Sequence, residues 1–186
     1  ITVGGKALRE HFEAINHRNA IYYVEDIIKK EEPFSEWQIR NIHQLILKNI
    51  DDDNAGRYRQ QNVLISGATN TPPDYTLLND KMAHFVDWYN SESNQLHPIE
   101  RAAKVHADFV GIHPFIDGNG CISRLLLNLE LLKAGYPPCV ITVENYLAYH
   151  EALDQWMAYG KTKPFIQLVA DAVLEGFKPY QVVIGL

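Results

Sequence analysis

The chain has 186 residues, a length that suits roughly one domain with a single hydrophobic core. Its 17 Lys and Arg against 23 Asp and Glu give a formal net charge of −6 with no basic cluster, which disfavours non-specific binding to nucleic acid or to an anionic membrane. No apolar run approaches the roughly 20 residues of a membrane-spanning helix, and two cysteines are too few for a disulfide framework. We therefore expect one acidic, cytoplasmic domain over residues 1–186.

Apolar residues recur at helical spacing through most of the chain and predict a mainly α fold. Ser35 is placed as the N-cap of the second helix, and Glu175-Gly176 is interpreted as the end of the last helix, with glycine just beyond it. The predicted helices cover residues 8–28, 36–47, 74–88, 98–111, 125–134, 146–159 and 164–174.

The segment between the second and third predicted helices has a different composition. A short run rich in β-branched residues, Val63 to Ile65, is followed by Gly67 and then by Pro72-Pro73. Such a run between turn-forming residues predicts a small extended or hairpin segment in an otherwise helical protein.

One stretch, from His113 to Arg124, combines several chemically useful residues and reads HPFIDGNGCISR. Gly118 and Gly120 flank Asn119 just before a helix, and such a turn can point successive backbone N–H groups at a bound anion. Arg124 falls one turn into the helix, where a guanidinium can reach a phosphate held at the helix N-terminus. The spacing therefore favours an anion site.

Two further side chains of this stretch suit reaction chemistry. Asp117 could hold a divalent metal through hard oxygen ligands, and His113 has the near-neutral pKa that a proton acceptor needs. Together these groups could bind a nucleotide phosphate and activate a hydroxyl. The alternative, a surface loop rich in turn formers beside a core histidine, stays open, and no Walker A loop is present.

The same stretch closely resembles the Fic motif, H-P-F-x-(D/E)-G-N-G-R-x-x-R. The likeness extends to the segment over residues 4–17, to residues 56–73, which are similar to the family's flap, and to residues 164–166, at the start of its last core helix. The resemblance implies a Fic-type helical bundle with a short β-hairpin flap beside the active site. It places the core at about residues 35–175 and the flap at about 58–71.

Fic proteins typically transfer AMP from ATP to a Tyr, Ser or Thr hydroxyl of a target protein, so the resemblance implies this activity, called AMPylation. It implies that His113 is the general base, that Asp117 holds Mg²⁺ and that ATP is the co-substrate. The nucleotide-binding residues that it implies are Phe115, Gly118, Asn119, Gly120, Cys121, Arg124, Asn145 and Tyr149.

The same resemblance implies that the flap docks the target protein, because an extended segment can pair with the target's main chain and place the target's hydroxyl near the base. The residues expected to dock the target are Val63, Leu64, Ile65, Ser66 and Gly67. The resemblance also implies a core from a bacterial member whose inhibitory helix would lie upstream of Thr2, and it leaves a homo-oligomer open.

The sequence departs from the family where Cys121 occupies the position of the first motif arginine. A thiol supplies neither the charge nor the donors of a guanidinium, and the loss should cost about 2 to 3 kcal/mol, or roughly 30- to 150-fold in affinity or rate. Natural attenuation, an engineered change and a redox-sensitive thiol of lowered pKa all remain open. Tyr146 and His150 are a second departure, beside the expected adenine pocket.

Two other functions remain as alternatives. One is a metal-dependent phosphohydrolase or de-AMPylase built on His106, Asp108, His113 and Asp117. The other is a non-catalytic module that binds nucleotide or protein. The family's inhibitory pattern, (S/T)-x-x-x-E-(G/N), is matched only loosely by Glu175-Gly176.

Overall fold

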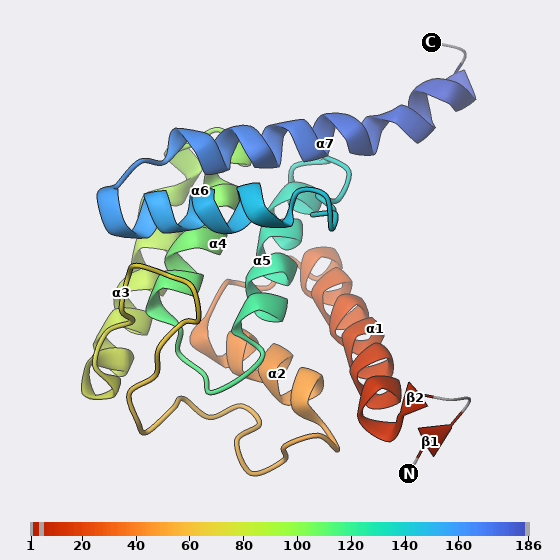
Figure 1. Ribbon diagram of the computed structural model, residues 1–186. Coiled ribbons are helices and arrows are strands. Elements are labelled where there is room, and N and C mark those ends of the chain that lie inside the picture. The colour runs from red at the N-terminus through yellow and green to blue at the C-terminus, as the bar shows by residue number, and fades with distance from the viewer. Residues whose placement is uncertain (1, 4–5, 185–186) are drawn as a thin grey trace.

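The computed structural model describes residues 2–3 and 6–184. It is mainly helical, as predicted, and two short strands, β1 (Thr2–Val3) and β2 (Lys6–Ala7), pair antiparallel before the first helix (Figure 1). The helices are α1 (Leu8–Lys29), α2 (Glu36–Leu47), α3 (Leu78–Ser91), α4 (Pro98–Ile112), α5 (Asn119–Lys133), α6 (Tyr146–Tyr159) and α7 (Lys163–Ile184), with 3-10 turns η1 (Tyr75–Leu77) and η2 (Ser93–Gln95).

Helices α4 and α5 form the centre of the molecule, with α1 and α2 on one side and α6 and α7 on the other (Figure 1). One buried cluster includes Phe109 of α4 and Leu126 of α5 and extends to α1, α2 and α3. A second cluster includes Ala103 of α4 and Leu131 of α5 and extends to Phe165 of α7. The loop that joins α4 to α5 is therefore held by two helices that are both packed on two sides.

Local signals set where several helices begin. Ser35 caps α2 as predicted, because its hydroxyl accepts the Gln38 N–H at 3.4 Å while the Gln38 side chain accepts the Ser35 N–H at 3.2 Å. The carboxylate of Asp74 accepts the Thr76 N–H at 2.9 Å and starts the 3-10 turn that leads into α3. The predicted helix from 74 is thus a 3-10 turn followed by an α-helix.

The expected β-hairpin in the flap does not form, since no strand lies between α2 and α3 in the described chain. The loop is closed by side chains instead of by a strand ladder. Asn62 donates to Asp74 at 2.8 Å and accepts the Tyr75 N–H at 2.9 Å, while the Thr69 N–H donates to Asp154 of α6 at 2.6 Å. These contacts tie both ends of the loop without giving it a partner strand.

The last helix is longer than predicted, because α7 continues through Gly176 to Ile184. Gly176 does not end the helix: a Cβ there would lie 3.2 Å from Pro137, so the missing side chain allows α7 to pack closely on the loop after α5. No helix in the described residues is long and apolar enough to cross a membrane.

Candidate active site

The loop from α4 to α5 begins at His113, which has a left-handed backbone with φ of 51°. Such a conformation is strained for a residue with a side chain and is kept only where neighbours enforce it. The buried Arg59 is that neighbour: its Nε donates to the His113 carbonyl and its backbone N–H to the Pro114 carbonyl, both at 2.9 Å. Arg59 also donates to the carbonyls of Gln61 and Pro73, so one side chain joins the flap to the loop.

The imidazole of His113 is oriented for proton transfer. Its Nδ1 lies 3.3 Å from the Val110 carbonyl, which fixes the proton on Nδ1 and leaves Nε2 as the free acceptor. Burial lowers the pKa of His113, the contact with Val110 opposes this, and the charge of Arg59 lowers the pKa further. The ring is therefore neutral near pH 7 and able to take a proton.

Behind the loop, His43 of α2 supports its shape from the interior. Its ring stacks on Phe115 with centroids 3.7 Å apart, accepts the Gly56 N–H at 2.8 Å through Nδ1 and donates through Nε2 to the Asp117 carbonyl at 3.1 Å. Burial lowers the pKa of His43 to about 4, so the ring stays neutral in this role. The sequence alone marks His43 only as a solvated or core histidine.

Asn119 and Phe115, both predicted to bind nucleotide, have buried side chains that hold the loop together. The Asn119 side chain accepts the Phe115 N–H at 3.0 Å and donates to the Phe115 carbonyl at 2.8 Å. Gly118 has φ of 80°, and a Cβ there would lie 3.4 Å from the His43 ring. The side chains of Phe115 and Asn119 thus face inward and fix the backbone that leads into α5.

The first turn of α5 presents donors and a charge. The N–H groups of Asn119, Gly120 and Cys121 belong to the turn that has no intrahelical acceptor. Arg124 folds back over this turn, since a Cβ on Gly120 would lie 3.3 Å from its Nη1. Arg124 lines the same cavity as the buried Tyr149 of α6; burial raises the pKa of Tyr149, and Arg124, as a charged hydrogen-bonding neighbour, only partly opposes this rise. The free N–H groups and the Arg124 guanidinium together suit the binding of an anion such as a phosphate.

These groups meet at a cavity of about 680 Å³, a volume in the usual range for ligand sites. His113, Gly120, Arg124 and Tyr149 line it, together with flap residues 65–68. The structure thus brings the predicted base, arginine and flap into one cavity.

Asn145 is not part of this cavity. It lines a separate one between α6 and α7, which Glu175 also borders. Glu175 pairs with Lys178 at 2.6 Å rather than with Arg124.

On the opposite side of the turn, Asp117 and Cys121 face α1 across a cavity of about 410 Å³. Asp117 accepts from Arg9 Nη2 at 3.1 Å, and the Cys121 thiol lies 3.2 Å from Nδ1 of His17. Burial raises the pKa of Cys121, which outweighs the opposite effect of Arg124. The hypothesis of a thiol with lowered pKa is therefore wrong.

The metal cluster of the phosphohydrolase alternative does not form. In the described residues no three His, Cys, Asp or Glu side chains gather as metal ligands. His106 is buried against Tyr149, and Asp108 pairs with Lys104 at 2.6 Å. The exposed Asp117 carboxylate alone fits a metal, because Mg²⁺ is usually held by one or two carboxylates together with substrate phosphates and water.

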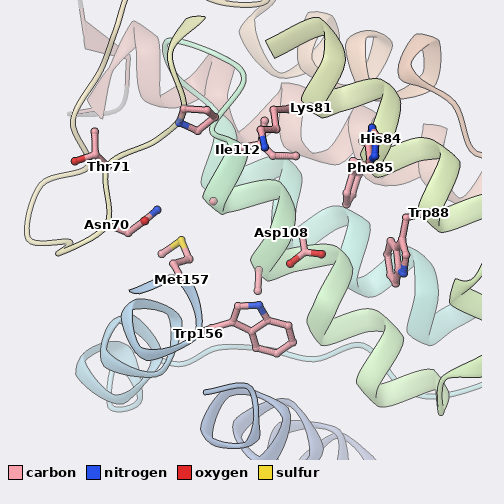
Figure 2. Close-up of a pocket in the computed structure, with 13 residues that line it drawn as sticks. Asn70, Thr71, Lys81, His84, Phe85, Trp88, Asp108, Ile112, Trp156 and Met157 are labelled. Atoms are coloured by element: carbon pink, nitrogen blue, oxygen red, sulfur yellow. The ribbon is translucent and has the colours of Figure 1, made fainter. Parts of the chain in front are cut away.

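Another cavity, of about 590 Å³, lies on the far side of the flap between α3, α4 and α6 (Figure 2). Asp108 lies between Trp88 and Trp156, and Met157 points toward the loop that carries Asn70 and Thr71. None of the residues from His113 to Arg124 lines this cavity.

Comparison with known proteins agrees with this geometry. The Fic/DOC family model matches residues 33–131, just over half of the chain, so the chain belongs to this family. It is 40% identical over 172 residues to a protein adenylyltransferase Fic of Nematostella vectensis, covering 91% of this chain and 40% of that protein. It is 37% identical over 173 residues to protein adenylyltransferase fic-1 of Caenorhabditis briggsae, covering 91% and 34%.

A solved structure of Fic-1 from C. elegans superposes with a TM-score of 0.87 at 33% identity, covering 100% of this chain and 55% of that one. The predicted Fic-type fold is thereby confirmed. The chain spans little more than a third of the length of the curated relatives it matches.

Proposed function

We propose that this chain transfers AMP from ATP to a hydroxyl side chain of a target protein. The observation that carries the proposal is the shared cavity in which the free Nε2 of His113 and the guanidinium of Arg124 lie beside the open N-terminal turn of α5. The relatives named protein adenylyltransferase support the same reaction.

In this reaction the target hydroxyl oxygen attacks the α-phosphorus of ATP. A new oxygen–phosphorus bond forms, the bond to the β-phosphate bridging oxygen breaks, and pyrophosphate leaves. His113 Nε2 takes the hydroxyl proton, which makes the oxygen a better nucleophile. Arg124 and the backbone N–H groups of Gly120 and Cys121 stabilise negative charge on the phosphates, and such preorganised donors supply much of the rate in phosphoryl-type transfer.

Asp117 is the residue that would hold Mg²⁺, and Arg9 would have to release it. When bound, the ion would neutralise phosphate charge. Phe115 and Asn119 would act through the shape of the loop and Tyr149 through its position beside Arg124, while Asn145 would act indirectly as the residue at which α6 begins.

The flap is proposed to dock the target. In residues 63–68, which lie in the described chain, one backbone hydrogen bond is made, from the Ala68 N–H to the Ile65 carbonyl. Val63, Leu64, Ser66 and Gly67 therefore keep backbone groups for an added target strand. The Leu64 side chain is 82% exposed, which offers the target an apolar contact. We propose that the flap covers about residues 58–71 and that the catalytic core covers about residues 35–175. We also propose that the protein is cytoplasmic.

The test is incubation of the purified chain with Mg²⁺, a protein lysate and ATP labelled on the α- or the γ-phosphate. We expect label on protein from α-labelled ATP alone and a loss of at least about 100-fold in His113→Ala, because the general base is gone. His84→Ala is the matched control, since His84 is an exposed histidine of α3 outside this cavity. Transfer from γ-labelled ATP, or equal labelling by His113→Ala, would contradict the mechanism. ATP binding without any transfer would indicate the binding-module alternative.

A further inference from the structure

A line of polar side chains runs from the cavity into the core and crosses three helices. Arg124 of α5 and Tyr149 of α6 line the same cavity, where Arg124 acts on the Tyr149 hydroxyl as a charged hydrogen-bonding neighbour, and this hydroxyl lies 3.0 Å from Nε2 of His106 of α4. His106 is 0% exposed and packs against Phe165 with centroids 5.0 Å apart. The line therefore connects an exposed arginine to a fully buried imidazole.

The hydrogen-bond donors and acceptors of Arg124, Tyr149 and His106 fit together as follows. A guanidinium has only donors, so the Tyr149 oxygen accepts from Arg124. The Tyr149 O–H is buried and needs an acceptor of its own, which Nε2 of His106 supplies. His106 is neutral, because burial together with the charge of Arg124 lowers its pKa to about 3. Its proton then lies on Nδ1.

His106 contributes little to this fold that an apolar residue could not. In the described part of the chain its Nδ1 has no hydrogen-bond partner, so Tyr149 is the one polar contact of the ring. A buried, unpartnered N–H costs stability that a leucine would not cost. A polar residue buried at such a place calls for a role beyond packing.

We propose that His106 is a positioning residue for phosphate binding: it holds the Tyr149 hydroxyl as an acceptor toward Arg124 and thereby keeps the guanidinium over the first turn of α5. This inference rests on the proposed function, in which Arg124 binds the ATP phosphates. Arginine has many rotamers, and ordering it before the ligand arrives removes part of the entropic cost of binding.

The experiment compares ATP with adenosine, which lacks phosphates, by calorimetry on the purified chain. His106→Leu removes the acceptor at similar size and should weaken ATP binding about 5- to 15-fold, as the loss of one hydrogen bond predicts, with adenosine unchanged. His106→Gln keeps an acceptor oxygen and should restore most of the ATP affinity. An equal loss for ATP and adenosine, or no rescue by Gln, would overturn the inference in favour of a packing role.

A double mutant of Arg124 and His106 distinguishes this inference from the proposed function. In an Arg124→Ala background, His106→Leu should cause no further loss of ATP affinity, because the group that it positions is absent. If Arg124→Ala weakens ATP binding and His106→Leu does not, the inference fails and the proposed function stands. If Arg124→Ala has no effect, the proposed phosphate role itself fails.

Tyr149→Phe tests the same line if His106→Leu does not fold. It removes only the hydroxyl and should weaken ATP binding by a similar factor, with adenosine affinity nearly unchanged. Full ATP affinity in Tyr149→Phe would also overturn the inference.

Discussion

The first turn of α5 has two faces with different chemistry. Gly120 and Arg124 face the cavity that holds His113, whereas Asp117 and Cys121 face α1. The first face carries a charge that is tied to a neighbouring helix through Tyr149. The second carries a half-buried thiol against His17 and an exposed ion pair with Arg9. The departure at Cys121 therefore lies away from the proposed base.

The largest effect should come from the face toward His113. Arg124→Ala should weaken ATP binding on the order of 100-fold, because it removes a charge-assisted contact with phosphate. Cys121→Ala, its counterpart on the other face, should change ATP affinity less than about threefold. Calorimetry with ATP measures both, and a larger effect at Cys121 would reverse the comparison.

A substitution that raises ATP affinity from the α1 side of the turn would sharpen the comparison of the two faces. Cys121→Arg should raise ATP affinity about tenfold, less than the 30- to 150-fold expected from the family position, because the side chain starts from the α1 side of the turn. The measurement is again ATP calorimetry, with Cys121→Gln as a control that adds length without charge. An equal gain in both variants would show that charge is not the cause.

The pH dependence should report on the imidazole of the catalytic cavity. Because burial lowers the pKa of His113 below its ordinary value of 6.5, kcat/KM should stay constant as pH falls to 6.5 and decline only below it. A decline that begins above pH 6.5 would contradict the assignment of His113 as the base.

Melting temperature over the same pH range is the control for unfolding. His43 and His106 also have lowered pKa values, about 4 and about 3, so the folded chain binds fewer protons than the unfolded chain below pH 6.5. Their contribution to stability is complete above 6.5 and decreases as pH falls toward 4. Activity that declines at a higher pH than stability would thus report on His113 itself.

The smallest effect should come from Arg9, which competes with a metal for Asp117. Both partners are more than half exposed, so the pair is weak, and Arg9→Gln should tighten Mg²⁺ binding by a few-fold with the melting temperature unchanged. Mg²⁺ titration calorimetry in the presence of ATP checks this, with Arg18→Gln on the same helix as the control. Weaker Mg²⁺ binding in Arg9→Gln would mean that Arg9 assists the phosphates instead.

Much of this protein could be predicted from local sequence. Helical spacing located all seven α-helices of the described residues, and Ser35 marked the start of α2, because periodicity and capping depend on residues within a few positions of one another. The motif likewise named His113 and Arg124, which the structure brings together. The β-hairpin expected in the flap and the predicted end of the last helix were wrong, because a strand needs a partner and because Gly176 packs against Pro137 within α7.

Tertiary structure alone decided which residues support that motif and which way each one faces. Arg59, His43 and His106 are distant from the motif or carry no distinctive spacing, yet each fixes a loop carbonyl or a side chain at the site. The separation of Cys121 from the His113 cavity also depends on tertiary packing, because α1 packs against α5 whereas α6 packs against α4. The residue types and their local spacing determine the chemistry that is available, whereas the packing of distant helices determines which groups are buried, neutral and aimed at one another.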